Sequence, residues 1–171
     1  KLERIHTNIL VKMEVSRTRE PPLAFAVIGP PSIGKTQLVD KIFRIINDIC
    51  VFHGFRNNRY DPRYRYNYNW NDDYMSGLTA AHRHMVIDDA GQLLPTLTQN
   101  SNGGAVGKCI EFINSTPLIT NQAELENKGR IPFLCKDVAI TSNFANCGFD
   151  EVFKPGGGIY RRFIYIHAEV R

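Results

Sequence analysis

An eight-residue stretch with two glycines, 29–36, carries the residue types needed to hold a phosphate chain. Its residues match the pattern of glycine, four residues, glycine, lysine, then serine or threonine. Glycine backbone leaves amide N–H groups free to surround phosphate oxygens at a helix N-terminus. Lys35 is predicted to contact the β- and γ-phosphates, and Thr36 to ligate Mg²⁺. The sequence therefore predicts a site for Mg²⁺ and ATP, or a similar nucleotide, formed by Gly29, Pro30, Pro31, Ser32, Ile33, Gly34, Lys35 and Thr36.

Two adjacent carboxylates, Asp88 and Asp89, follow the apolar run 84–87. In a P-loop enzyme, the acid that assists Mg²⁺ stands at the end of such a strand. Asp88 is predicted to hold the metal through water, and Asp89 to polarise the attacking water, because in-line hydrolysis needs an oriented nucleophile. Aspartate is also common at helix N-caps and in turns, so the pair indicates a site only together with 29–36.

A second apolar run, 139–143, ends in small polar residues, the last of which is Asn143. An asparagine beside the γ-phosphate can hydrogen-bond that phosphate or the lytic water and so report which nucleotide is bound. Asparagine is equally a routine turn residue at a strand end, and this alternative stays open.

Two arginines, Arg161 and Arg162, come shortly after the glycine run 156–158. One of them is a candidate arginine finger, which stabilises charge on the transferring phosphoryl group and in ring ATPases comes from the neighbouring subunit. The alternative is a pair of solvated surface arginines at the start of a strand.

The apolar pattern predicts the elements that must position these residues. Apolar residues at helical spacing predict a helix after Lys35 that extends to Ile49 and packs its apolar face on the strand 23–28, and another helix over 104–113. Strands alternating with helices predict an α/β P-loop domain with three layers and a mostly parallel central sheet. The predicted strands are 23–28, 85–88, 137–141 and 162–167.

The length of 171 residues suits one domain. We predict an N-terminal helix and linker over 1–22 and a P-loop ATPase domain over 23–171, truncated at its C-terminus. The polar face of the helix is not strongly basic, which favours packing on the domain over the alternative of a membrane surface. The apolar residues at helical spacing in this helix are Leu2, Ile5, Ile9 and Met13.

Composition gives weaker indications about partners. The formal charge of +4, from 21 basic and 17 acidic residues, is compatible with an anionic partner without requiring one. No apolar stretch approaches the roughly 20 residues that span a bilayer. The cysteines show no C-x-x-C spacing, so we expect free thiols in a reducing compartment rather than a zinc or redox motif. They are Cys50, Cys109, Cys135 and Cys147.

The stretch 56–70 interleaves arginines with aromatic residues. This pattern suits single-stranded nucleic acid, whose bases stack on rings and whose phosphates pair with arginine. Tyr64, Tyr66 and Tyr68 also alternate with polar residues, as in a half-buried edge strand. The strand interpretation is favoured, and nucleic-acid contact remains the alternative.

Four segments in order, GPPSIGKT, HMVIDD, AITSN and YRRF, resemble the motifs of superfamily-three helicases. The similarity is greatest to the replication ATPase of picornaviruses and their insect, plant and marine relatives. It covers 23–163 and includes the aromatic-to-tyrosine segment 70–74, Gln92 and the Glu-Asn-Lys-Gly segment 126–129.

The resemblance implies an AAA+-like fold and a hexameric ring with nucleotide at the subunit junctions. It also implies an ATPase that acts as an RNA helicase or remodeller at the cytoplasmic face of host membranes. The implied partners are single-stranded or structured RNA, further copies of the chain and other viral replication proteins. Matching motifs give phosphate and Mg²⁺ binding to Lys35 and Thr36, the second motif to Asp88 and Asp89, the sensor to Asn143, and the finger to Arg161 or Arg162.

Two departures from the family pattern limit these expectations. The membrane-binding segment expected before the ATPase domain is missing, as is the C-terminal region with its cysteine-rich element and oligomerising helix. We therefore expect this fragment to be monomeric or weakly associated, with the hexamer and the membrane contact belonging to the parent protein. A nucleotide-switched scaffold or membrane-remodelling ATPase without unwinding is the alternative function. The loop 96–104, with Lys108 behind it, is a candidate for RNA contact, although it holds no arginine or aromatic residue.

Overall fold

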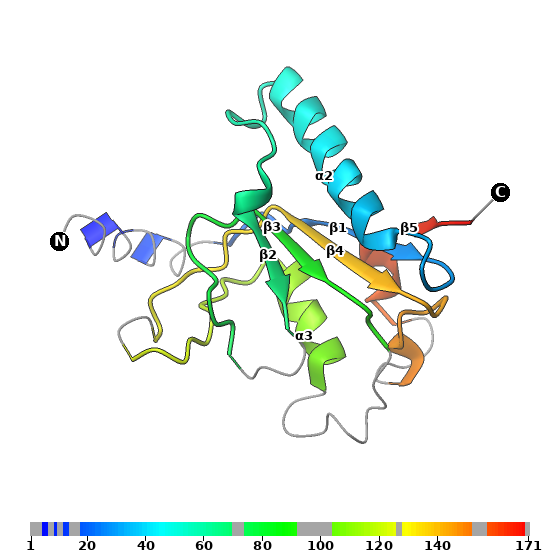
Figure 1. The fold of residues 1–171 in the computed structure, drawn as a ribbon. Coiled ribbons are helices and arrows are strands. Elements are labelled where there is room, and N and C mark those ends of the chain that lie inside the picture. Colours follow the sequence, from blue (N-terminus) through cyan, green and yellow to red (C-terminus); the bar gives the residue numbers. More distant parts are fainter. Residues whose placement is uncertain are drawn as a thin grey trace.

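The computed structural model describes residues 5–6, 9, 12–13, 18–69, 74–91, 104–125, 128–151 and 157–169. Within these residues, five parallel strands form one sheet in the order β2-β3-β4-β1-β5 (Figure 1). Non-consecutive strands are neighbours, because helices cross over between parallel strands. The strands are β1 (Leu23–Ile28), β2 (Arg65–Tyr68), β3 (His84–Ile87), β4 (Asp137–Ser142) and β5 (Ile164–His167).

The two longer helices cover opposite faces of the sheet, as Figure 1 shows. Phe25 and Val27 of β1 pack with residues of α2 (Lys35–Phe52), whereas Ala26 packs on the face that holds α3 (Gly104–Ile113). Successive side chains of a strand point to opposite faces, so a run apolar throughout supplies both cores. The α/β three-layer fold predicted from the sequence is confirmed.

Strands β1 and β4 run in register over their whole length, from Leu23 beside Asp137 to Ile28 beside Ser142. Strand β3 pairs with the other side of β4, with Ile87 beside Ile140. Because all three strands are parallel, the segments that follow them leave the sheet at the same edge. This edge brings the residues after Ile28, Ile87 and Ser142 together.

The predicted strand bounds needed small corrections. Strand β3 ends at Ile87, so Asp88 lies in the loop rather than in the strand. Strand β5 begins at Ile164, because Tyr160–Arg162 form the 3-10 turn η4. The edge-strand interpretation of the tyrosine-rich stretch is confirmed in part: Tyr66 and Tyr68 are buried in edge strand β2, while Tyr64 ends the preceding 3-10 turn η1 (Pro62–Tyr64).

The predicted packing of α2 was wrong at its C-terminal end. Val39 and Phe43 are buried, but Ile49 is 54% exposed. An 18-residue helix is about 27 Å long and a six-residue strand about 20 Å, so the last turns extend past the sheet (Figure 1). The apolar positions of those turns therefore face outward.

The N-terminal segment is described at five residues, all of which are helical and exposed. Ile5, Ile9 and Met13 were expected to pack on the domain, yet each is about half exposed. The expected packing of these residues is therefore not found. In the described part of the chain, none of the helices has the length and hydrophobicity of a membrane-spanning segment.

Candidate active site

The loop 29–34 joins β1 to α2 and turns sharply against the sheet. Gly29 lies so close to the chain after β5 that an added Cβ would be 2.4 Å from the Ala168 carbonyl oxygen. Ser32 (φ 66°) and Gly34 (φ 80°) both adopt left-handed backbone. Gly34 is also the N-cap of α2 and provides no side-chain hydrogen bond. The first N–H groups of the helix are thus left for a ligand, which favours an anion.

The ammonium group of Lys35 is held by three oxygens at the start of α2. Its Nζ donates to the carbonyls of Gly29 (3.0 Å) and Pro30 (2.8 Å) and to Asn143 Oδ1 (2.7 Å). The residue is only 8% exposed, so its ammonium group is held in one position. Lys35 and Asn143, which are 108 positions apart in the sequence, meet because β1 and β4 end side by side.

Asp88 gathers hydroxyl groups from two neighbouring segments. Thr36 Oγ1 donates to Asp88 Oδ1 (3.1 Å) and Oδ2 (3.2 Å), and Thr141 Oγ1 donates to Asp88 Oδ1. Carboxylate and hydroxyl oxygens are the hard ligands that Mg²⁺ prefers, and they converge here beside Lys35. The residues present therefore fit a magnesium site.

Asp89 takes a different direction from its neighbour, because its backbone is left-handed (φ 54°). Its N–H donates to Thr141 Oγ1 (2.9 Å), and the next N–H, of Ala90, donates to the Thr141 carbonyl (2.8 Å). Aspartate is among the residues that tolerate such a backbone conformation. Both aspartates line the same cavity, and their separate roles stay a prediction.

These residues surround one cavity of about 500 Å³ at the C-terminal edge of the sheet. It receives side chains from the loop after β1, from the loop after β3 and from the end of β4. The residues that line it are Pro31, Ser32, Gly34, Lys35, Thr36, Gln37, Asp88, Asp89, Thr141 and Asn143.

The two arginines lie elsewhere. Arg161 and Arg162 are exposed in η4, and neither is among the described residues that line the cavity. The turn is positioned through Tyr160, whose hydroxyl donates to Asp150. A role for either arginine in the cavity of its own chain finds no support in this arrangement, whereas a role in a neighbouring subunit is compatible with their exposure.

Sequence reasoning assigned no role to Thr141, which organises the acid loop. Its hydroxyl contacts Asp88, and its hydroxyl and carbonyl receive the N–H groups of Asp89 and Ala90. The sequence did contain a signal for this contact. The run 139–143 ends in small polar residues, and in a parallel sheet that end lies beside the end of the strand that the acids follow. Other predicted features, namely Gln92, the loop 96–103 and positions 70–73 and 126–127, lie outside the described residues.

The sheet order and the loop between β1 and α2 define an α/β domain of the P-loop NTPase-like class. The sequence profile described as RNA helicase matches residues 25–144, so the chain belongs to the RNA helicase family, and the resemblance to superfamily-three helicases of picorna-like viruses is confirmed.

Similar curated proteins are viral. They include the genome polyproteins of Feline calicivirus, of its strain Japanese F4 and of its strain F9. Each is 21% identical over 165 residues, which cover 96% of this chain and 8% of the polyprotein. The chain thus spans a small part of the length of the relatives it matches.

Proposed function

We propose that the chain hydrolyses ATP or another nucleoside triphosphate with Mg²⁺, and that hydrolysis drives unwinding or remodelling of RNA in viral genome replication. Membership of the RNA helicase family supports the general class. The observation that carries the proposal is the single cavity in which Lys35, Thr36, Asp88 and Asn143 meet from three separate segments.

The P-loop residues are proposed to bind the phosphate chain. Lys35 would hold the γ-phosphate, because its ammonium group is fixed at the cavity beside Asn143. The amides of loop 29–34 and of the first turn of α2 would surround the remaining phosphate oxygens. Thr36 and Asp88 would hold Mg²⁺, which when bound neutralises charge on the β- and γ-phosphate oxygens.

Three further residues are proposed to assist the attack by water. Asp89 would accept a proton from the water and orient it, since its carboxylate faces the cavity apart from that of Asp88. Asn143 would contact the γ-phosphate or the water. Arg161 or Arg162 would complete the site from a neighbouring copy, because both are exposed and lie away from the cavity of their own chain.

The proposal extends to the setting in which the chain acts. Its partners would be single-stranded or structured RNA, other viral replication proteins and further copies in a ring formed by the parent protein. The site of action would be the cytoplasmic face of replication membranes in the host cell. Family membership and the viral polyprotein relatives support the RNA partner and the replication context.

The test is the rate of ATP hydrolysis per chain measured over a range of protein concentrations. We expect the rate to rise with concentration, to vanish in Lys35→Ala and to fall strongly in Arg162→Ala. Wild-type turnover in Lys35→Ala would refute hydrolysis at this cavity. A rate that is independent of concentration and survives in a variant lacking both Arg161 and Arg162 would refute the shared site. Ring formation without ATP-dependent strand displacement would favour the scaffold alternative.

A further inference from the structure

A second cavity, of about 510 Å³, lies at the N-terminal edge of the sheet, opposite the P-loop edge. Tyr64, Arg83 and Lys136 line it, and they come directly before β2, β3 and β4. Arg83 N donates to the Tyr64 carbonyl (2.9 Å), and Lys136 N donates to the Arg83 carbonyl (2.7 Å). The three side chains therefore form a row across neighbouring strands. The six residues of β4 separate this row from the P-loop edge by roughly 20 Å.

The rim of this cavity carries positive charge that no buried acid neutralises within the described residues. Arg83 donates to two backbone carbonyls, of Ala80 (2.5 Å) and His82 (3.2 Å). Arg59 makes no hydrogen bond or ion pair with the part of the chain that the structure describes. Lys136 contacts Glu20 at 3.0 Å, but this pair is at the surface, where an ion pair contributes little. All three cations can accept a new anion at small cost.

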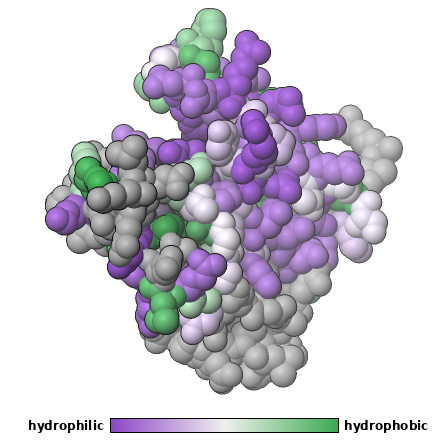
Figure 2. All heavy atoms as spheres, turned by 60° about the vertical axis from the view of Figure 1, so that its left-hand side comes forward, coloured by the Kyte–Doolittle hydropathy of each residue, from purple (hydrophilic) through white to green (hydrophobic). Residues whose placement is uncertain are grey.

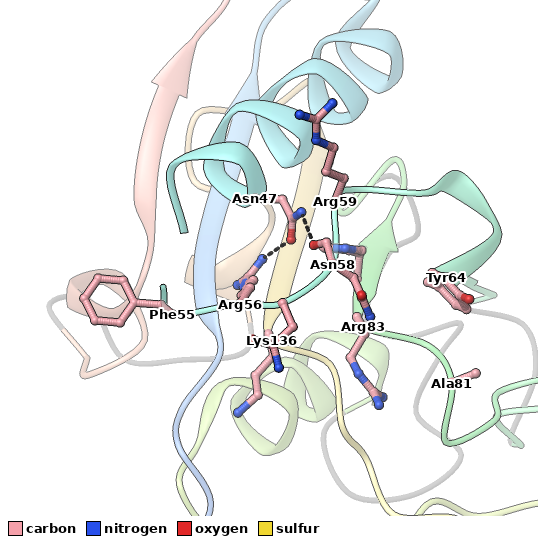
Figure 3. Close-up of a pocket in the computed structure, with 11 residues that line it drawn as sticks. Asn47, Phe55, Arg56, Asn58, Arg59, Tyr64, Ala81, Arg83 and Lys136 are labelled. Atoms are coloured by element: carbon pink, nitrogen blue, oxygen red, sulfur yellow. Dashed lines mark hydrogen bonds between the residues drawn. The ribbon is translucent and has the colours of Figure 1, made fainter. Parts of the chain in front are cut away.

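The floor of the cavity is neutral overall. Asp137 is fully buried beneath it and binds Arg56 through two bonds of 2.8 Å and His84 through one of 2.8 Å. Asn47 accepts from Arg56 and donates to the Asn58 carbonyl (Figure 3). One arginine is thus used to compensate the acid, and the charge of the rim cations remains available for a ligand.

The shape of the region suits an extended ligand. A neighbouring cavity of about 430 Å³ shares Arg83 and Lys136 with the first, so these two cations border both cavities, which we together call the groove. In Figure 3, Arg83 and Lys136 extend in one direction and Arg59 in the other. A single phosphate cannot contact cations placed in this way, whereas a chain of phosphates can.

Exposed aromatic rings stand at both ends of the cavity. Phe55 is 81% exposed and Tyr64 is 40% exposed, and Figure 3 shows them on opposite sides of the central polar cluster. Figure 2 turns this side of the molecule forward and shows a broad hydrophilic surface below an apolar tip. Rings beside a cationic groove are the arrangement that binds single-stranded nucleic acid, because bases stack on rings while phosphates contact the cations.

We propose that Arg59, Arg83 and Lys136 bind the backbone of single-stranded RNA, and that its bases stack on Phe55 and Tyr64. This is a second ligand site, distinct from the nucleotide cavity. The choice of RNA as the bound polymer rests on the proposed function. An interaction with the phosphates of anionic lipids uses the same cations, but it gives no role to two separated rings.

The test is the binding of a short fluorescein-labelled oligouridylate to the full chain, followed by fluorescence anisotropy without nucleotide over a series of salt concentrations. In the double variant Arg83→Gln/Lys136→Gln, we expect affinity at about 0.1 M salt to fall roughly tenfold. The slope of log affinity against log salt should decrease by about 1.4, because two single-strand phosphate contacts are lost. Phe55→Ala and Tyr64→Ala should each weaken binding about fivefold or more.

The matched control is Lys12→Gln/Lys128→Gln, which removes the same charge from two exposed lysines outside the groove. It should keep the wild-type salt slope. Equal affinity and slope in the groove variant and this control would overturn the proposal. So would a groove variant that loses binding to phosphatidylserine vesicles or to inorganic pyrophosphate while its RNA binding is unchanged.

Two measurements distinguish a loss of RNA binding at the groove from a loss of the folded state. Thermal unfolding and ATP hydrolysis show whether the double variant is folded. If it is not, Lys136→Gln and Phe55→Ala replace it, since both side chains are largely exposed. Lys35→Ala should bind RNA as the wild type does, so failure of the hydrolysis proposal and failure of the groove proposal give different outcomes.

Discussion

The two ends of the parallel sheet place aspartates in opposite environments. At the C-terminal end, Asp88 and Asp89 follow β3 and stay exposed at the cavity. At the N-terminal end, Asp137 begins β4 and is fully buried. Asp88 accepts from hydroxyl groups and Asp89 donates its backbone N–H to one, whereas the buried residue contacts Arg56 and His84. The same residue type is thus proposed to bind a ligand at one end and is buried in the structure at the other.

The difference between the two ends follows from whether the carboxylate is buried or exposed. A carboxylate removed from water needs cationic partners, or its burial costs several kcal/mol. Asp137 has such a partner in Arg56, which compensates its charge inside the protein, and His84 adds a hydrogen bond. Asp88 accepts hydrogen bonds from the hydroxyl groups of Thr36 and Thr141 and lies exposed at the cavity, where a cation from solution can reach it. Substitutions at the two ends should therefore affect different properties.

The largest expected effect is on stability, at the N-terminal end. Asp137→Asn leaves Arg56 and His84 without their acid, and breaking one member of a buried ion pair costs about 3–5 kcal/mol. Unfolding in urea, followed by circular dichroism, measures this loss. The control is Asp61→Asn, whose partner Arg63 is largely exposed, and it should leave the unfolding midpoint unchanged. Equal midpoints in the two variants would contradict the structural role of Asp137.

The contacts of Asp137 with Arg56 and His84 also predict how the stability of the protein depends on pH. Burial by itself raises the pKa of Asp137, but hydrogen bonds from His84 and Arg56 outweigh it, and the pKa lies below the ordinary value of 3.8. A lowered folded-state pKa stabilises the protein above that ordinary value, and the stabilisation is lost as pH falls through the lower folded-state value. Between pH 7 and about pH 3, the wild type should lose more stability than Asp137→Asn.

The next largest effect is on catalysis, at the C-terminal end. Asp88→Asn removes the charge proposed to hold Mg²⁺, whose electrostatic contribution is several kcal/mol. We expect ATP hydrolysis to fall by about a hundredfold or more, with the urea midpoint close to that of the wild type. Loss of stability comparable to that of Asp137→Asn, with hydrolysis retained, would reverse the assignment of the two ends.

The smallest effect concerns the phosphate loop. Gly29→Ala places a Cβ 2.4 Å from the Ala168 carbonyl oxygen, and such overpacking costs about 1–3 kcal/mol. It should also displace the loop and weaken the binding of a fluorescent ATP analogue. Gly54→Ala is the matched change: φ is +75° and nothing lies within 4 Å, so only a backbone cost of about 1 kcal/mol is expected, with nucleotide affinity unchanged.

Much of the fold could be predicted from the sequence, because its signals are local. The apolar run 23–28, the glycine loop and the helix after Lys35 follow one another in the order that a phosphate site requires. The alternation of Tyr66 and Tyr68 with polar residues likewise identified an edge strand. These patterns depend on neighbouring residues, and the structure contains each of them.

The packing of helix ends could not be predicted in the same way. Ile49 continues the apolar periodicity of α2, yet it is exposed because the helix is longer than the strand beneath it. Ile5, Ile9 and Met13 also have helical spacing but remain half exposed. Periodicity shows which side of a helix is apolar, whereas burial depends on whether another element lies opposite.

The sequence by itself determined the chemical groups of the proposed nucleotide site, since the loop 29–36 and the acid pair are each contiguous. Tertiary structure decided which distant groups meet. Thr141 reaches Asp88 across 53 positions, and Arg56 reaches Asp137 across 81. Both contacts depend on β4 lying between β1 and β3, which sets its two ends beside different segments. That strand order leaves Asp88 exposed at the cavity and Asp137 buried beside Arg56.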